Sequence, residues 1–212
     1  MTEGLRERKK RQTRRRIAGT AARLFAERGF DHVTIAEVAE AADVSVNTVY
    51  NYFEAKEDLV LPPDQASPDR LAAIVRDREP GEPAFAAVLR RLRDELRRRD
   101  RSLGLIEGFG RFLEMVRAAP TLVARLEDLH VQMVAALTAE LAKETGADPD
   151  DPLPALVAGQ IGWLHAHVLA ESGRHALAGH TPDATAEALL ALLDEAETLI
   201  GERALTYAVR KG

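Results

Sequence analysis

A short segment of the chain, residues 44–59, concentrates polar and aromatic side chains that could bind a large polar ligand. It reads VSVNTVYNYFEAKEDL and holds two of the three tyrosines of a protein that is only 5% aromatic. Ser, Thr and Tyr hydroxyls can bond phosphate oxygens, and an Asn amide can pair bidentately with adenine. A Lys shortly after the tyrosines also suits phosphate. This combination is typical of a surface that contacts a nucleic acid.

The apolar pattern around the segment predicts how these side chains are held. Val49 and Phe53 are spaced i, i+4, so the segment forms a short helix with one narrow packing stripe. Thr34 and Glu37 form a capping box that starts a preceding helix, and Asp43 marks a tight turn between the two helices. Two short helices joined by such a turn form a helix-turn-helix, whose second helix suits the major groove.

An alternative is that the aromatic residues of this segment simply close a small helical core. We expect this role for Phe53. We do not expect it for Tyr50 and Tyr52, because the helix already has its packing stripe. The two tyrosines are therefore expected to face a nucleic-acid backbone.

The rest of the chain has the apolar period of helices, and no stretch alternates with period two long enough for a strand. A helix is expected from Ile17 to Arg28, ended by Gly29, and another from Lys56 to the prolines at 62 and 63. Longer helices are predicted at residues 69–77, 83–100, 103–118, 121–145, 153–178 and 183–205. The sequence thus predicts an all-α chain with a boundary near residue 61.

Composition narrows the class of protein. The 212 residues include no cysteine, which excludes disulfides, thiolate chemistry and cysteine-based zinc sites. No apolar run approaches the roughly 20 residues of a membrane span, and the charged N-terminus lacks the apolar region of a secretory signal. We expect a cytoplasmic protein with no membrane partner.

Enzyme motifs are missing from the sequence. It has no G-x-S-x-G, no Gly-rich phosphate loop followed by Lys, and no H-E-x-x-H. We therefore expect neither an enzyme nor a cofactor. His167, Glu171 and His175 share a helix face, but a single ion could reach only two of them, so no metal site is predicted.

Charge is distributed unevenly along the chain, whose net charge is −5. Residues 1–16 carry eight Lys or Arg against two Glu, a net +6, so the remainder carries −11. A basic arm on an acidic body is either a solvated, disordered tail or a contact for phosphates. Beside a predicted helix-turn-helix, we expect Arg14 and Arg15 to follow phosphates or to enter the adjacent minor groove.

Residues 14–60 resemble the N-terminal domain of TetR-type transcriptional regulators. The resemblance covers LFAERGF, T-I-A-E-V-A-x-A-A-x-V-S and T-V-Y-x-Y-F-x-x-K-x-x-L. It implies a three-helix helix-turn-helix DNA-binding domain at residues 1–61 and a helical ligand-binding and dimerisation domain at residues 62–212. It also implies a repressor that binds a pseudo-palindromic operator as a homodimer and is released by a small-molecule effector. An activator, or an architectural DNA-binding protein without an effector, is the alternative.

The resemblance also implies roles for individual residues. The positions of Ser45 to Thr48 face DNA bases, and the two tyrosines face phosphate or sugar. Thr34 and Lys56 contact the phosphate backbone of the DNA. The complete set of predicted DNA-binding residues is Arg14, Arg15, Thr34, Ser45, Val46, Asn47, Thr48, Tyr50, Asn51, Tyr52 and Lys56. Two departures stand out. Asp43 replaces the usual glycine of the turn, and Pro62-Pro63 interrupts the helix that would join the two domains.

The C-terminal part carries two expectations from the resemblance, a dimer surface and an effector pocket. The last two long helices have an apolar surface broader than one packing face needs, which suits a dimer contact, although it could equally be buried within one subunit. Gly104, Gly108 and Gly110 either leave room for a ligand or permit close helix packing. The predicted ligand-binding residues are Glu107, Phe112, Met115, His130, Met133, Gln160, Trp163 and His167.

Overall fold

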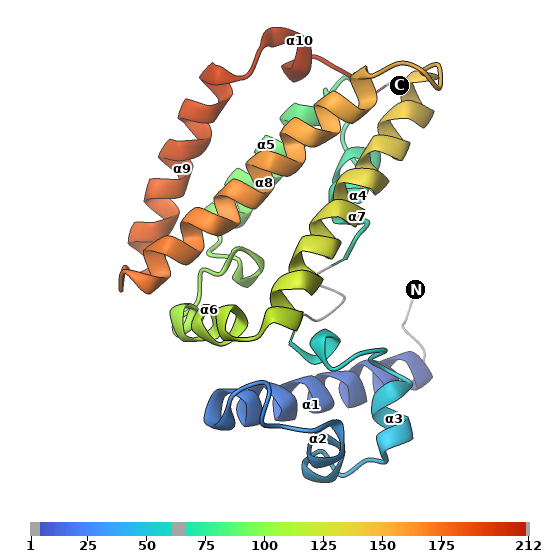
Figure 1. The fold of residues 1–212 in the computed structure, drawn as a ribbon. Coiled ribbons are helices and arrows are strands. Elements are labelled where there is room, and N and C mark those ends of the chain that lie inside the picture. Colours follow the sequence, from blue (N-terminus) through green and yellow to red (C-terminus); the bar gives the residue numbers. More distant parts are fainter. Residues whose placement is uncertain (1–4, 61–66, 211–212) are drawn as a thin grey trace. The chain divides into compact units, whose positions relative to one another are not determined.

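The computed structural model describes residues 5–60 and 67–210, and for residues 5–7 the backbone alone. The chain divides into two compact units. We call residues 1–66 with 114–125 the head, and residues 67–113 with 126–212 the body. Within the described residues all regular structure is helical, apart from one antiparallel bridge between Pro83 and Val209 (Figure 1). The predicted all-α class is confirmed.

The head consists of α1 (Leu5–Arg28), α2 (Ile35–Ala41), α3 (Val46–Tyr50) and a 3-10 turn, η1 (Glu57–Leu59), together with the segment 114–125. Its core is apolar. Ile17 and Phe25 of α1 are buried with Val49 and Phe53, as the spacing of the last two residues predicts. The rings of Phe25 and Phe30 meet at 5.1 Å between centroids. A small core of this kind fixes α3 against α1 through a few side chains.

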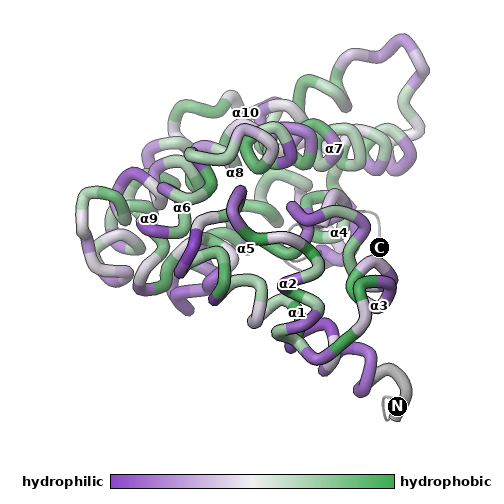
Figure 2. The backbone as a smooth tube through the Cα atoms, turned by 60° about the horizontal axis from the view of Figure 1, so that its bottom comes forward, coloured by the Kyte–Doolittle hydropathy of each residue, from purple (hydrophilic) through white to green (hydrophobic). Residues whose placement is uncertain are grey.

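Helix α1 is longer than the sequence pattern predicts. It begins at Leu5 rather than at Ile17, and Ile17 is its first fully buried residue. Residues 8–12 are exposed on all sides, and the chain here is strongly hydrophilic (Figure 2). Arg, Lys and Gln are good helix formers, so the packed part of the helix can extend into this basic stretch. The predicted arm is therefore a helical extension.

The body contains most of the chain. It holds α4 (Arg70–Arg76), α5 (Ala84–Arg97), a 3-10 turn η2 (Arg101–Leu103), α8 (Leu153–Leu177), α9 (Pro182–Leu199) and α10 (Glu202–Leu205). Helices α6 (Phe109–Ala118) and α7 (Pro120–Thr145) contribute residues to both units. Helix α9 packs against both α5 and α8, and α4 packs against α5 (Figure 1). The core of the body is built mainly from these helices.

Several predicted helix boundaries were wrong, and each has a local cause. Helix α6 starts at Phe109 rather than at residue 103, because Gly104 and Gly108 have φ of 73° and 80°. The Phe109 ring occupies the space that a Cβ at Gly104 would need. Helix α9 ends at Leu199 because the next residue is extended (ψ 128°).

The head also departs from the predicted helix lengths. Helix α3 covers only residues 46–50, so Phe53, which the spacing from Val49 places on the helix, lies beyond its end. In place of a helix from Lys56 there is the single turn η1, and Pro62-Pro63 lies outside the described residues.

A buried arginine ties residues 207–210 to the turn between α4 and α5. Arg78 is 1% exposed, and its guanidinium donates to the carbonyls of Val75, Glu82 and Ala208 and to the carboxylate of Glu144. The backbones of Gly81 and Arg210 pair as well, with an N···O distance of 2.9 Å. The buried charge is thus fully partnered, as a charge in a protein interior requires.

Helix α8 is long and apolar enough to cross a membrane by composition, and no other described helix is. The sequence pattern predicts no such run. Its inner face is buried in the body, whereas its outer face carries Gln160, His167 and Arg174. This distribution is that of a core helix with one solvated face.

Candidate nucleic-acid interface

The N-terminus of α2 is fixed by the capping box that the sequence predicts. Thr34 Oγ1 accepts from Glu37 N at 3.2 Å, and Glu37 Oε2 accepts from Thr34 N at 2.7 Å. Arg28 of α1 adds a 2.6 Å ion pair to the same carboxylate. The hydrogen bond from the Thr34 backbone, followed by the one from Arg28, lowers the pKa of Glu37 to about 2. Thr34 therefore anchors α2, and its hydroxyl is already engaged by Glu37.

The turn between α2 and α3 forms with an aspartate in the usual glycine position. Asp43 has φ of 51°, and the turn is closed by a 3.0 Å hydrogen bond from Val44 N to Ala39 O. Asp is one of the few residues that adopt this left-handed conformation without large strain. This turn thus fixes the direction in which the chain enters α3 from α2.

Helix α3 presents one polar face. Ser45 caps it, with Oγ accepting from Thr48 N at 3.0 Å, and the two hydroxyls are 2.8 Å apart. Val49 is fully buried and Phe53 nearly so, which turns the opposite face outward. On that face lie four exposed predicted residues at helical spacing: Val46, Asn47, Tyr50 and Asn51. Thr48 and Tyr52 are half-buried at its edges.

Lys56 is held beside aromatic rings. Its Nζ lies 4.2 Å from the centroid of Phe30 and 5.9 Å from that of Phe25. A cation over an aromatic face is attracted by the ring quadrupole, so the ammonium has a defined place at the start of η1. A neighbouring ion pair holds η1 itself. Asp58 Oδ1 meets Arg125 Nη2 at 3.1 Å, and Oδ2 accepts from Ala55 N at 3.0 Å.

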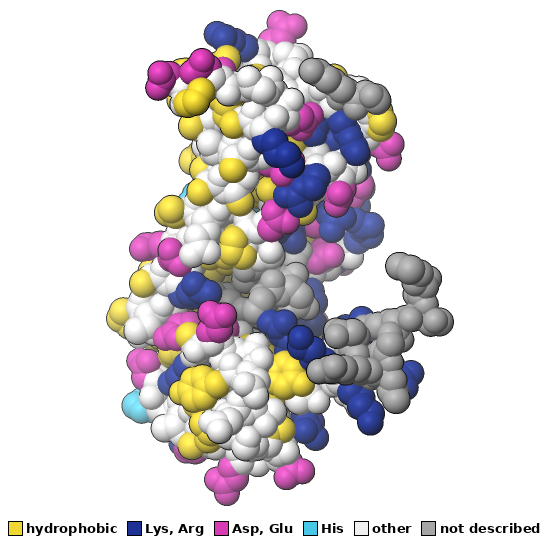
Figure 3. Space-filling view, turned by 90° about the vertical axis from the view of Figure 1, so that its right-hand side faces the viewer, with side chains coloured by type: hydrophobic (Ala, Val, Ile, Leu, Met, Phe, Trp, Pro, Cys, Tyr) yellow, Lys and Arg dark blue, Asp and Glu magenta, His cyan; other side chains and the backbone are white. Residues whose placement is uncertain are grey.

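The two predicted arginines of α1 are placed differently. Arg14 lies with its guanidinium carbon 5.3 Å above the Phe53 ring, and its Nε is buried without a hydrogen-bond partner among the described residues. Arg15 is exposed, as are Arg8, Lys9 and Lys10 on the preceding turns. Lys and Arg side chains gather on the part of the head that carries these turns (Figure 3). Lys9 and Lys10 were not among the predicted DNA-binding residues, although they belong to the +6 segment.

Comparison with known proteins identifies the family. Residues 17–61 match the family described as bacterial regulatory proteins, tetR family. The HTH-type transcriptional regulator TcmR of Streptomyces glaucescens is 33% identical over 156 residues, which cover 70% of this chain and 67% of TcmR. The chain belongs to the TetR family. This TetR-family chain is thus a DNA-binding transcriptional regulator, a class whose members are not enzymes.

Solved structures share the fold of this TetR-family regulator. NalD of Pseudomonas aeruginosa, the secondary repressor of the MexAB-OprM multidrug efflux pump, matches with a TM-score of 0.54 at 18% identity. The match covers 88% of this chain and 97% of NalD. NemR of E. coli in its reduced form matches with a TM-score of 0.51 at 17% identity, over 87% and 96% of the two chains. The shared architecture extends well beyond the helix-turn-helix.

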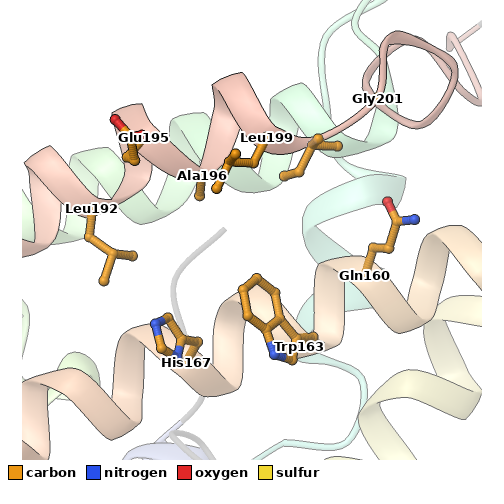
Figure 4. A pocket seen from close by; sticks show the side chains of 9 residues that line it. Gln160, Trp163, His167, Leu192, Glu195, Ala196, Leu199 and Gly201 are labelled. Carbon is orange, nitrogen blue, oxygen red and sulfur yellow. The ribbon is translucent and has the colours of Figure 1, made fainter.

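Three of the predicted ligand-binding residues of the regulator meet at one groove. Gln160, Trp163 and His167 project from α8 toward α9 and its C-terminal end (Figure 4). The rings of Trp163 and His167 stack at 5.1 Å with an interplanar angle of 8°. The groove has a volume of about 440 Å³, and its other lining residues are Leu192, Glu195, Ala196, Leu199, Ile200 and Gly201. It opens on an apolar surface, since Trp163 is 59% and Leu199 79% exposed.

The other five predicted ligand-binding residues do not line this groove. Glu107 is exposed in the turn before α6, and Phe112 stacks on Phe109 at 5.8 Å. Met115 belongs to the head, while His130 and Met133 lie on α7 in the body. His165 was not among the predicted ligand-binding residues. The structure buries this residue on the inner side of α8, at 3% exposure.

Proposed function

We propose that this regulator is a homodimeric repressor that binds a pseudo-palindromic operator and releases it when a small-molecule effector binds. The observation that carries the DNA-binding part is the exposed polar face of α3, held by a buried stripe and a serine cap. The dimensions of α3 and its exposed amides suit the major groove, where each base pair presents a distinct pattern of donors and acceptors. Its place of action is the cytoplasm.

Within this proposal the side chains of the head divide into two groups. Asn47 and Val46, near the N-terminus of α3, read base edges, with Asn47 offering the bidentate geometry that adenine accepts. Lys56, the tyrosines and the exposed cations of α1 meet phosphates, which supply affinity without sequence information. A helix is about 10 Å wide and the minor groove about 6 Å, so the helical extension of α1 follows phosphates rather than entering that groove.

The outer surface of α8 and α9 is the proposed dimer contact. Leu156 and Trp163 are exposed two helical turns apart on α8, and Leu199 projects from the end of α9. Exposed apolar side chains that continue across two neighbouring helices are typical of an interaction surface. A second copy related by a two-fold axis would cover the same surface on each protomer and present two copies of α3 to a symmetric operator.

Selection of binding sites from a random duplex library tests the DNA-binding proposal. The selection is run at about 150 mM salt, because affinity for DNA depends on ionic strength. An inverted repeat is expected from the wild type, and Asn47→Ala should relax preference at one base of each half-site by about 1–3 kcal/mol. Binding without enrichment, lost as salt rises, would instead indicate an architectural protein that does not read sequence.

Sedimentation tests the dimer. Leu199→Glu places a charge on the proposed contact, and Val131→Glu is the matched control, because Val131 is similarly exposed (64%) but lies on α7. We expect a dimer at micromolar concentration for the wild type and the control, and a monomer for Leu199→Glu. A wild-type monomer, both alone and with DNA, would refute the proposal.

A further inference from the structure

The body contains one buried histidine whose hydrogen bonding is incomplete. His165 lies on α8 with 3% of its surface exposed, and its Nδ1 atom is buried without a hydrogen-bond partner among the described residues. Buried polar atoms are nearly always partnered, and an exception calls for an explanation such as a role in binding. The orphaned Nδ1 therefore points to a group that the protein itself does not supply.

The surroundings of His165 are polar on one side. Arg70 of α4 lies close enough to act on the ring electrostatically, and it binds Glu95 of α5 through Nη2 at 2.7 Å. His130 of α7 is the other charge-bearing neighbour. The His130 ring reaches α8 one turn before His165, since a Cβ at Gly162 would be 3.5 Å from its Cε1 atom. Helices α4 and α7 thus direct polar groups toward this part of α8.

His165 is uncharged at neutral pH. Burial, with smaller contributions from the charges of Arg70 and His130, lowers its pKa to about 4. A neutral imidazole has one donor and one acceptor nitrogen, and which of them is Nδ1 depends on the tautomer. A hydroxyl can donate or accept, so it can partner Nδ1 in either tautomer, whereas a carbonyl can only accept.

The arginine that acts on the ring is already paired with a buried carboxylate, because Arg70 binds Glu95. Glu95, itself 1% exposed, also pairs with Arg91 at 2.7 Å. Asp100 accepts from Ser102 N at 2.9 Å and is influenced by the same two arginines. Since Arg70 already has its carboxylate partner, an ionised ligand would bring an unpaired charge into a buried site. The helices that carry these groups are otherwise apolar inside, with Leu71, Val75, Leu92, Leu96, Leu164 and Val168 all buried.

We propose that the effector binds beside His165 and is an uncharged, largely apolar molecule with an alcohol or phenol hydroxyl that hydrogen-bonds to Nδ1. This inference deepens the proposed function and rests on it, because it names the chemical class of the effector. Binding removes the apolar surface of the ligand from water, and the hydroxyl completes the hydrogen bonding of the histidine. Specificity arises because a ligand without the hydroxyl leaves Nδ1 unpartnered.

The test compares three probes on the full chain by isothermal titration and equilibrium dialysis. 1-Naphthol carries the hydroxyl, naphthalene lacks it, and 1-naphthoate is ionised. We expect 1-naphthol to bind at least about tenfold more tightly than either of the others. In His165→Phe, which keeps a ring of similar size, this preference should fall below about threefold.

His167→Phe is the matched control, because His167 lies two residues along the same helix but lines the outer groove. It should retain the preference for 1-naphthol. A preference lost in His167→Phe but kept in His165→Phe would overturn the assignment, and so would equal binding of 1-naphthol and naphthalene or no binding of any probe. The His165 ring nitrogen resonances of the wild type, which should shift on addition of 1-naphthol, keep the test valid if His165→Phe folds poorly.

The DNA experiment separates failure of this inference from failure of the proposed function. Operator selection uses no ligand, so an enriched inverted repeat together with no hydroxyl preference would overturn the effector class alone. Loss of sequence selection would instead remove the regulator proposal on which the effector class rests.

Discussion

The stability of the body should depend on pH mainly through His165, and His165→Phe should remove most of that dependence. In the folded chain the pKa of His165 is lowered from 6.5 to about 4, chiefly by burial. Between these values the unfolded chain binds a proton that the folded chain does not. The contribution of His165 to the free energy of unfolding is therefore fully present above about pH 6.5 and is lost as the pH falls toward 4. This direction follows from a base whose charged form is disfavoured by folding.

The size of the effect follows from the same shift. A pKa difference of 6.5 against about 4 corresponds to about 3 kcal/mol in total, of which about 2 kcal/mol is lost between pH 7 and pH 5. Carboxyl groups with lowered pKa, such as Asp69 and Glu171, contribute mainly below pH 4.5. The pKa of His175 is also lowered, by burial and then by Arg174, so this histidine contributes over the same interval. The contribution of His165 is therefore the difference between the wild type and His165→Phe from pH 7 to pH 5.

Urea unfolding at pH 7, 6 and 5 measures the free energy of unfolding of three proteins at one concentration. The wild type and the control His167→Phe should each lose about 2 kcal/mol over this range, while His165→Phe should lose much less. At pH 7 the variant should be at least as stable as the wild type, because it removes a buried polar atom that has no partner. If His165→Phe keeps the wild-type pH dependence, the reasoning from burial is refuted.

Three further predictions concern residues with defined contacts. Thr34→Ala removes the cap of α2 and should lower the free energy of unfolding by about 1 kcal/mol, measured by urea unfolding. Lys56→Ala should weaken binding to every duplex equally and flatten the salt dependence of binding by about one unit, whereas Lys143→Ala should not; unequal losses would show that Lys56 reads sequence. Arg78→Met leaves Glu144 and three carbonyls without their buried donor and should cost about 3–5 kcal/mol, and a loss no larger than that of the exposed Arg76→Met would contradict this account.

The parts of the fold that could be predicted from sequence are those set by neighbours a few residues apart. The capping box at Thr34 and the buried pair Val49 and Phe53 depend only on i, i+3 and i, i+4 spacing, and both are as expected. The start of α6 depends on the positive φ of Gly104 and Gly108, which the apolar period of the segment does not reveal. Its predicted boundary was wrong for that reason.

The two candidate sites could also be predicted only in part from the sequence. The basic segment before Ile17 indicated contact with phosphates but not that it is helical, because repulsion between like charges and helix propensity favour opposite outcomes. His165 lies on the same buried face of α8 as Ile161 and Val168, and the helical spacing of these three residues can be read from the sequence. That its Nδ1 atom lacks a partner depends on helices distant in sequence, α4 and α7 among them, and only the tertiary structure shows this.

The pairing of residues 207–210 with the turn after α4 has a consequence for the order of folding. Arg78 and Gly81 receive their partners from a segment about 130 residues later in the chain, and α5 packs against α9 across a similar separation. During synthesis the body therefore cannot close its interior until residue 210 has emerged, and until then Arg78 lacks the Ala208 carbonyl. Contacts so distant in sequence slow folding, since a long loop must close before they contribute. The contacts among α1, α2 and α3 are local by comparison, so this part of the head can form while the ribosome is still adding the body.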